Sequence, residues 1–339
     1  MGPDLAPTSE VTAMSRSGSR SLALAILAFT LGACASGSGG PVPLDRIRLP
    51  MGYVPNVQYA PFYVADARGY FAEEGLEIDF DYAFETDGVA LVGAGDLPFS
   101  LASGEQVLLA RQQGVPVVYV LGWWQDFPVA VAAPAAGPID EPKDLVGARV
   151  GIPILGGASL IGYRALLDAN DLPDGAAFLD VIGFNQVEAL LAGQVDAVVV
   201  YANNEPIVLA NAGLPVNVLA TADYVTLASN GIITNEATIA NNPDLVRRMA
   251  RAFLRGLEDT LEDPDAAYEI CKDYVEGLGS ANQDVQRQVL DASMAFWKAE
   301  RLGYSDPAAW SNMQAVLREM GLLGETLDLS AAFTNEFLP

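Results

Sequence analysis

Histidine is absent from the 339 residues of this chain. Its absence excludes the usual Ser-His and Cys-His nucleophile pairs, histidine-ligated zinc, and histidine as a proton carrier near neutral pH. No other catalytic group stands out in the sequence. We therefore expect no enzymatic reaction, no metal site and no cofactor.

Cysteine and positive charge are also scarce. The chain has two cysteines, and its 18 lysines and arginines stand against 43 acidic residues, for a net charge of −25. This charge excludes nucleic acid and an anionic membrane surface as electrostatic partners. Cys271 lies in a helical pattern close to Tyr268 and Tyr274, which predicts a thiol packed in the core and no intrachain disulfide.

The apolar run near the N-terminus, Leu22 to Leu31, is shorter than the ~20 residues that a membrane-spanning helix needs. It follows Arg16 and Arg20, an arrangement typical of a signal-peptide core. Either Met1 or Met14 is compatible with this signal as the start of the chain.

The apolar run ends in Leu31-Gly32-Ala33-Cys34, which is typical of a bacterial lipoprotein box. In such a box small residues admit the signal peptidase, and the cysteine thiol takes the lipid. We predict a signal peptide over 1–33, lipidation of Cys34 and a flexible tether over 34–44. The alternative is an ordinary secretory signal, and both interpretations place the protein outside the cytoplasm.

The sequence from Leu49 to Tyr82 predicts a strand, a loop, a helix and a second strand. Apolar residues alternate at both ends of this stretch, and aromatic residues recur at spacings of three and four between Tyr59 and Tyr70. Pro61 suits the first turn of the helix, and Gly75 suits its left-handed end. The pattern is that of a βαβ unit in an α/β fold.

Loops at the carboxyl ends of strands face the binding crevice in open α/β sheets. The loop Gly52 to Gln58 is therefore expected at a cleft. Asn56 offers both a hydrogen-bond donor and an acceptor, and Tyr59 offers a stacking face with a polar tip, so both are candidate ligand contacts. The alternative is a loop-capping asparagine and a core tyrosine.

Three further stretches accompany this opening segment: PKDLVGARVGIP (Pro142 to Pro153), the turn GGAS (Gly156 to Ser159) and EALLAGQVDAVVV (Glu188 to Val200). Together with GYVPNVQYAPFYVA and GYFAEEGLEI they resemble the solute-binding proteins of the ThiY and SsuA superfamily, which serve ABC importers. The resemblance implies a two-lobed periplasmic-binding-protein fold, type II-like. Each lobe would be a mostly parallel sheet flanked by helices, with a hinge of two crossovers.

We place lobe 1 at 45–130 and 229–339, and lobe 2 at 131–228. The apolar run Val117 to Leu121 has the look of a buried parallel strand, and Ile232 with Ile233 is expected to return the chain to the first sheet. Ser103 and Gln106 are expected to form a capping box at a helix start. From Pro243 onward the pattern is helical.

Trp123, Trp124 and Gln125 follow the strand that ends at Leu121. Adjacent side chains on extended backbone point in opposite directions, so one tryptophan is expected to face the cleft as a stacking platform and the other to pack in the core. Gln125 could then read a polar ring edge, or only hydrate the hinge.

The turn containing Gly157, Ala158 and Ser159 opens a helix whose free N–H groups suit a phosphate, sulfonate or carbonyl oxygen. The spacing does not match a P-loop, because the lysine is missing. The alternative is a tight turn in which Ser159 caps the helix. By resemblance, the turn faces the ligand.

Tyr201, Asn203 and Glu205 end the strand on the opposite side of the cleft, where relatives carry a similar ligand-facing cluster. Glu205 would accept a hydrogen bond from an amino or imide N–H of the ligand. The alternative is a carboxylate that answers the dipole at a helix N-terminus.

These features predict an extracytoplasmic lipoprotein, monomeric, that binds a small heteroaromatic vitamin or precursor and delivers it to an ABC permease and its ATPase. An aminopyrimidine thiamine precursor and riboflavin are both compatible with the aromatic loops. The alternatives are a sulfonate or nitrate binder, which a cleft Arg164 would favour, a pyrimidine synthase, which the missing histidine disfavours, and a lipoprotein sensor or scaffold.

Overall fold

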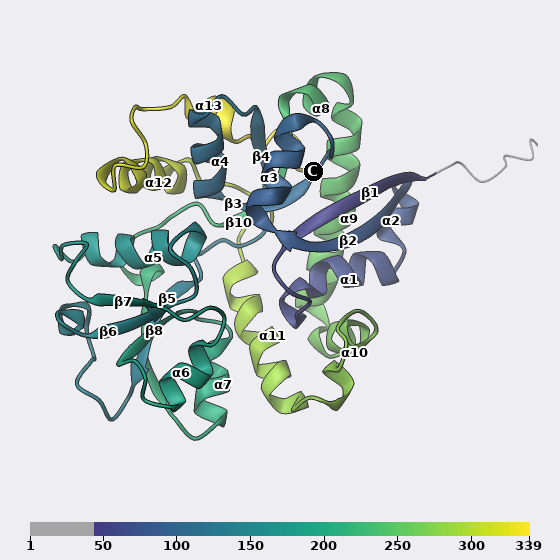
Figure 1. Cartoon of the computed structure of the whole chain (residues 1–339). Helices are drawn as coiled ribbons and strands as arrows, with labels where there is room; N and C mark the ends of the chain where they lie inside the picture. Colours follow the sequence, from purple (N-terminus) through teal and green to yellow (C-terminus); the bar gives the residue numbers. More distant parts are fainter. Residues whose placement is uncertain (1–43) are drawn as a thin grey trace, which may run out of the picture. The chain divides into compact units, whose positions relative to one another are not determined.

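The computed structural model describes residues 44–339 (Figure 1). The predicted signal peptide, the lipidation site Cys34 and nearly all of the predicted tether lie outside the described residues. Within the described part of the chain, no helix combines the length and the apolar composition that a membrane span requires.

Strands and helices alternate through the first two thirds of the described chain, and helices make up the rest. The strands are β1 Asp45–Gly52, β2 Leu76–Phe84, β3 Ser100–Ser103, β4 Val117–Gly122, β5 Val129–Pro134, β6 Arg149–Ile152, β7 Phe178–Val181, β8 Ala197–Tyr201, β9 Val216–Ala220 and β10 Asn230–Asn235. The α-helices are α1 Ala60–Ala67, α2 Tyr70–Glu73, α3 Glu85–Ala94, α4 Gly104–Gln112, α5 Gly157–Asp168, α6 Gln186–Leu191, α7 Glu205–Asn211, α8 Glu236–Asn241, α9 Pro243–Glu262, α10 Pro264–Tyr274, α11 Gln283–Trp297, α12 Pro307–Glu319 and α13 Leu329–Ala332. Short 3₁₀ turns are η1 Val57–Tyr59, η2 Pro142–Leu145, η3 Thr221–Asp223 and η4 Leu278–Ser280.

The strands form three sheets. β1 pairs with β2, β10 lies between β3 and β4, and a five-stranded sheet has the order β7-β6-β8-β5-β9. All of its strands come from 129–220, and its helices α5, α6 and α7 lie beside it in Figure 1. The limits proposed for the two lobes, at residues 130 and 228, remain predictions.

Strand direction differs in part from the parallel sheets that were expected. β1 and β2 are parallel, as are β6 with β7 and β6 with β8. In contrast, β10 is antiparallel to β3 and β4, and β5 is antiparallel to β8 and β9. Thus β4 is buried as predicted but its ladder is antiparallel, because β10 enters that sheet on the return of the chain from the five-stranded sheet.

The predicted βαβ unit is present, with one interruption. Pro61 lies in the first turn of α1, and Asp45 of β1 stands opposite Leu76 of β2. Gly69 has a φ of 77°, which ends the α1 segment before α2 begins. Gly75 has a φ of 73° at the following turn, as predicted for a left-handed glycine.

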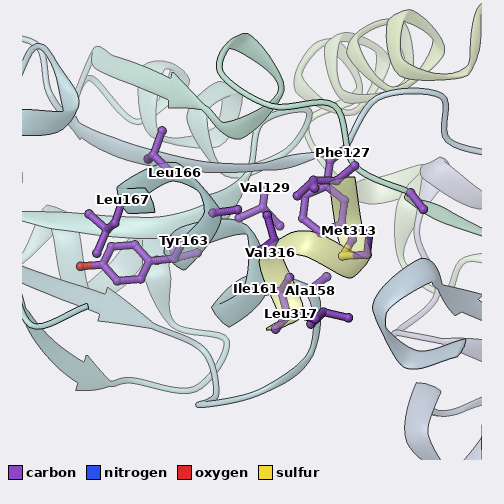
Figure 2. Packing of buried hydrophobic residues seen from close by; sticks show 14 of the residues in the cluster. Phe127, Val129, Ala158, Ile161, Tyr163, Leu166, Leu167, Met313, Val316 and Leu317 are labelled. Atoms are coloured by element: carbon purple, nitrogen blue, oxygen red, sulfur yellow. The ribbon is translucent and has the colours of Figure 1, made fainter. Parts of the chain in front are cut away.

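The core beside the five-stranded sheet is built where α5 meets β5 and α12 (Figure 2). Val129 of β5 and Ile161 of α5 are almost fully buried, and Met313 and Leu317 of α12 pack into the same cluster. A second buried cluster joins α1 to α9, whose Met249, Phe253 and Leu257 recur at intervals of four residues and form one apolar face.

Candidate functional site

The candidate site is a cavity at the ends of several strands. The cavity has a volume of about 190 Å³, many times the roughly 10–15 Å³ that one water molecule needs. Its wall comes from the ends of β1 and β8, the start of α3, the residues after β4, and the turns that open α5 and α6. Segments far apart in the sequence therefore meet at one place, as the rule for carboxyl ends of strands requires.

Several of the residues that line the cavity are aromatic. The ring of Trp123 lies 5.5 Å from the ring of Tyr59, and the ring of Trp124 lies 6.1 Å from that of Tyr201. All four residues line the cavity. The Tyr59 hydroxyl donates to the carbonyl of Met51, so the ring of Tyr59 is held by a polar contact as well as by packing.

Both tryptophans line the cavity, whereas alternation along an extended strand predicted that one alone would do so. That prediction was wrong because the backbone bends after Gly122, where β4 ends. The N–H groups of Trp123 and Trp124 both donate to the carbonyl of Asn230, at 3.1 and 2.9 Å, and strand alternation no longer applies.

The glycine-rich turn also lies on the cavity wall. Gly157, Ala158 and Ser159 line it, and α5 begins at Gly157, which has a φ of 59°. The predicted role of Ser159 as helix cap is wrong, since the cap is Gly156 and Ser159 is already inside the first turn. The first N–H groups of a helix have no partner within the helix, so the turn has backbone donors that no bond within α5 satisfies.

Tyr201, Asn203 and Glu205 divide into two groups. Tyr201 and Glu205 line the cavity, but Asn203 is fully buried and donates to Ser293 Oγ of α11 at 2.8 Å. Glu205 accepts from the N–H of Tyr201 at 3.0 Å, and burial raises the pKa of its carboxyl. Glu205 is the first residue of α7, so both functions considered for it, at the cleft and at the helix start, have a structural basis.

Two other candidates have hydrogen-bond partners within the protein and do not line the cavity. Asn56 caps η1, where its side chain accepts from the N–H of Gln58 at 3.1 Å. Gln125 donates from its side chain to the carbonyl of Gly122 and from its backbone to that of Phe296. Asn56, Gln125 and Asn203 are not among the cavity-lining residues, and their contact with a ligand stays a prediction.

Sequence reasoning missed Tyr53, Phe84, Glu85, Phe184 and Asn230, all of which line the cavity. Phe84 is the last residue of β2 and Glu85 the first of α3, so the rule about carboxyl ends could have identified them. The rings of Tyr53 and Phe184 meet edge to face, with their centroids 5.4 Å apart. This contact joins the segment after β1 to the segment after β7.

Glu85 belongs to a buried hydrogen-bonded group that the sequence did not reveal. Ser103 Oγ lies 2.5 Å from Glu85 Oε1 and 2.5 Å from Glu105 Oε1, and the N–H of Ser103 also donates to Glu85 Oε1. The capping box expected between Ser103 and Gln106 does not form, because the Ser103 side chain makes no cap bond to α4. Burial, followed by the charge of Glu85, raises the pKa of Glu105 to about 8.

Among residues 44–339, no cationic side chain belongs to the cavity wall. The lining residues include no lysine and no arginine. Arg164, which would have favoured an anion, is outside this lining and forms a salt bridge with Asp174, with 3.5 Å between the Arg164 Nη2 and Asp174 Oδ2 atoms. Among residues 44–339, no group of three or more histidine, cysteine, aspartate or glutamate side chains is arranged to hold a metal ion.

The profile of the NMT1/THI5-like family matches residues 56–267. This chain belongs to that family. The chain is 41% identical over 318 residues to the riboflavin-binding protein RibY of Chloroflexus aurantiacus, covering 90% of this chain and 91% of that protein. It is 31% identical to the formylaminopyrimidine-binding protein of Halalkalibacterium halodurans, covering 74% and 76%. Pyrimidine phosphate synthases are also similar, among them one from Legionella pneumophila at 24% identity, covering 87% and 93%.

Solved structures share the fold of this family member. The periplasmic aliphatic sulphonate-binding protein SsuA of Escherichia coli superposes with a TM-score of 0.70 at 13% identity, covering 84% of this chain and 96% of that one. At this identity the likeness concerns the fold alone. The two-lobed periplasmic-binding-protein fold and the ThiY/SsuA-like superfamily expected from the sequence are confirmed.

Proposed function

We propose that this family member captures a flat heteroaromatic solute outside the cytoplasm, with riboflavin as the first candidate and an aminopyrimidine thiamine precursor as the second. The observation that carries the proposal is a cavity walled by Tyr59, Trp123, Trp124 and Tyr201 with no cationic side chain in its lining. Stacking on aromatic faces suits a flat ring, and the 41% identity to a riboflavin-binding protein favours the flavin.

Polar groups at the edges of this wall would set the orientation of the ring. The turn at Gly157 supplies N–H donors, and Glu205 and Glu85 supply acceptors. Donors and acceptors that line the same cavity as the aromatic rings suit a heterocycle that carries both carbonyl oxygens and N–H groups. A sulfonate or nitrate has no such donor edge and would meet two carboxyl groups without a cation.

Catalysis is not part of the proposal. The pyrimidine phosphate synthase of Legionella pneumophila is less similar to the chain than the two binding proteins are, and the absence of histidine from the chain disfavours a synthase. A sensor or scaffold role would use the same cavity and differ only in the partner. The absence of a neighbouring permease gene would favour that role.

We further propose that the protein is tethered through lipidated Cys34 and hands its ligand to an ABC permease and its ATPase. The motif Leu31-Gly32-Ala33-Cys34 supports the anchor. Cys34→Ala is expected to move the protein from the membrane fraction to the soluble fraction. Unchanged membrane partitioning of the variant would exclude the lipid as the anchor.

The test of the ligand is riboflavin titration followed by quenching of flavin fluorescence. Trp124→Ala is expected to weaken affinity roughly ten- to hundredfold, because stacking on an aromatic ring is worth ~1–3 kcal/mol. The matched control is Trp310→Ala. Trp310 is equally buried but packs on Tyr119 and Phe333 outside the cavity lining.

Both tryptophan variants should lose stability, while Trp124→Ala alone should lose affinity. Equal riboflavin affinity in wild type and Trp124→Ala would remove stacking from the proposal. No riboflavin binding by wild type, together with binding of an aminopyrimidine, would assign the site to the second candidate.

A further inference from the structure

The contact between Ser103, Glu85 and Glu105 requires a proton beyond the one on the serine. Ser103 Oγ lies at hydrogen-bond distance from one oxygen of each carboxyl group. A serine hydroxyl has a single proton and can donate to one of them. The second contact needs a carboxyl O–H that donates to Ser103 Oγ, so the two glutamates together hold one proton.

Burial decides which glutamate holds that proton. Glu105 is 0% exposed, and its Oε2 has no hydrogen-bond partner among the described residues. A charged carboxylate with a bare, buried oxygen is far more costly than a neutral carboxyl group. Burial raises the pKa of Glu85 as well, but Glu85 lines the cavity and accepts two hydrogen bonds from Ser103, which favour its charged form. The chain of donors therefore runs from Glu105 through Ser103 to Glu85.

Other titratable groups around the pair are neutral tyrosines and one more glutamate. Tyr119 of β4 and Tyr201 of β8 both interact with the two glutamates, and Tyr59 of η1 interacts with Glu85. Burial raises the pKa of each tyrosine, so all three stay protonated near neutral pH. Glu205 lies across the same cavity, and no lysine or arginine belongs to the lining.

We propose that Glu85 accepts a hydrogen bond from the N–H edge of the ligand, and that the proton held on Glu105 through Ser103 positions Glu85 for that contact. This inference rests on the proposed function, because it deepens recognition at the same cavity. Glu85 is the specificity-determining residue: it favours a ligand with a donor edge over one with acceptors only. Glu105 is a positioning residue that does not touch the ligand.

Ligand binding should then be linked to the proton on Glu105. A bound ligand displaces water from the cavity, which makes a second negative charge on the pair more costly and raises the proton affinity of Glu105 further. Above the pKa of Glu105 in the free protein, binding must take up a proton. Riboflavin affinity is therefore expected to be constant below about pH 8 and to fall by up to about tenfold per pH unit above it.

The experiment measures the dissociation constant of riboflavin between about pH 6 and about pH 9 for four proteins. Wild type and the exposed control Glu258→Gln should weaken at alkaline pH. Glu105→Gln, which mimics the protonated carboxyl group, should lose the alkaline decline. Glu85→Gln should bind roughly tenfold or more weakly than wild type at neutral pH, since hydrogen bonds to charged groups are the stronger ones.

An alkaline decline in Glu105→Gln equal to that of wild type would overturn the inference, and so would undiminished affinity in Glu85→Gln. A ligand-free measurement separates this failure from failure of the proposed function. Infrared spectra of the free wild-type protein should contain a protonated-carboxyl band that disappears near pH 8 and is missing in Glu105→Gln. If riboflavin does not bind, the proposed ligand fails, and the presence or absence of this band decides whether the pair holds its proton.

Discussion

At the residue scale, the charge of the cavity wall depends on the burial of one carboxyl group, that of Glu105. Glu105 lies in the first turn of α4 and is 0% exposed. Desolvation disfavours its charge, and the neighbouring charge on Glu85 adds to the effect, so its pKa is about 8 against an ordinary value of 4.5. A residue that contacts no ligand thus controls the charge presented by one that lines the site.

The raised pKa of Glu105 predicts how stability changes with pH. Between the ordinary pKa of a glutamate and about pH 8, the folded protein holds one proton more than the unfolded chain at this residue. The stabilisation from that proton is fully present below pH 4.5 and is lost as pH rises through about 8. Over this window the contribution falls by about 1.4 kcal/mol per pH unit.

The measurement is denaturant unfolding of wild type and Glu105→Gln at about pH 6, 7 and 8. Titrating groups that do not interact with Glu105 cancel in the difference between the two proteins. The free energy of unfolding of wild type should decline relative to that of Glu105→Gln as the pH rises. A difference that stays constant with pH would mean that Glu105 titrates like an exposed glutamate.

At the element scale, α5 connects the core of the five-stranded sheet to the cavity. Its first turn contributes Ala158 and Ser159 to the wall, and its next turns pack on β5 (Figure 2). The close approach is possible because position 162 is glycine: a Cβ there would lie 2.5 Å from Val129 Cβ. The position of the glycine-rich turn thus depends on packing one to two helical turns further along.

Gly162→Ala is therefore expected to lower the free energy of unfolding by ~1–3 kcal/mol, the usual cost of overpacking a filled core. Thermal or denaturant unfolding measures the change. The matched control is Gly175→Ala, because a Cβ at Gly175 would meet no atom within 4 Å. Equal stability of the Gly162 and Gly175 variants would show that α5 can move away from β5 without cost.

At the scale of the whole molecule, the cavity is lined by segments from both of the predicted lobes. Tyr53 follows β1 and Phe184 follows β7, and their rings are in contact although Phe184 remains 53% exposed. An exposed aromatic residue at a cavity edge, held by one contact across it, can seal the cavity when the lobes close and separate when they open. We therefore predict closure on the ligand, with this pair as the last contact.

Phe184→Ala should speed riboflavin dissociation roughly two- to tenfold, since an aromatic pair contributes ~0.5–1.5 kcal/mol beyond its burial. Stopped-flow displacement measures the rate. The matched control is Phe178→Ala at the start of β7, which is 68% exposed and outside the cavity lining.

Closure itself is tested by small-angle scattering. Riboflavin should reduce the radius of gyration of the wild-type protein, and an unchanged radius would refute closure.

Much of this protein could be predicted from residues close together in the sequence. The βαβ unit from β1 to β2 follows from apolar periodicity, Pro61 and Gly75, because strand alternation, helix faces and glycine turns are set within a few residues. The same holds for the helical pattern from Pro243 onward, where α9 begins. The family resemblance also depends on such local segments, and it led to the correct superfamily and fold.

Only the tertiary structure decided what each segment does at the cavity. Asn230 holds the two tryptophan N–H groups from a distant strand and so turns both rings to the site, while Ser293 of α11 draws Asn203 away from it. Glu85 and Glu105 meet at Ser103 because α3, which begins at Glu85, packs on β3, which ends at Ser103 just before α4. Hydrogen bonds and desolvation act between groups that are close in space, and no spacing along the chain specifies which distant groups will meet.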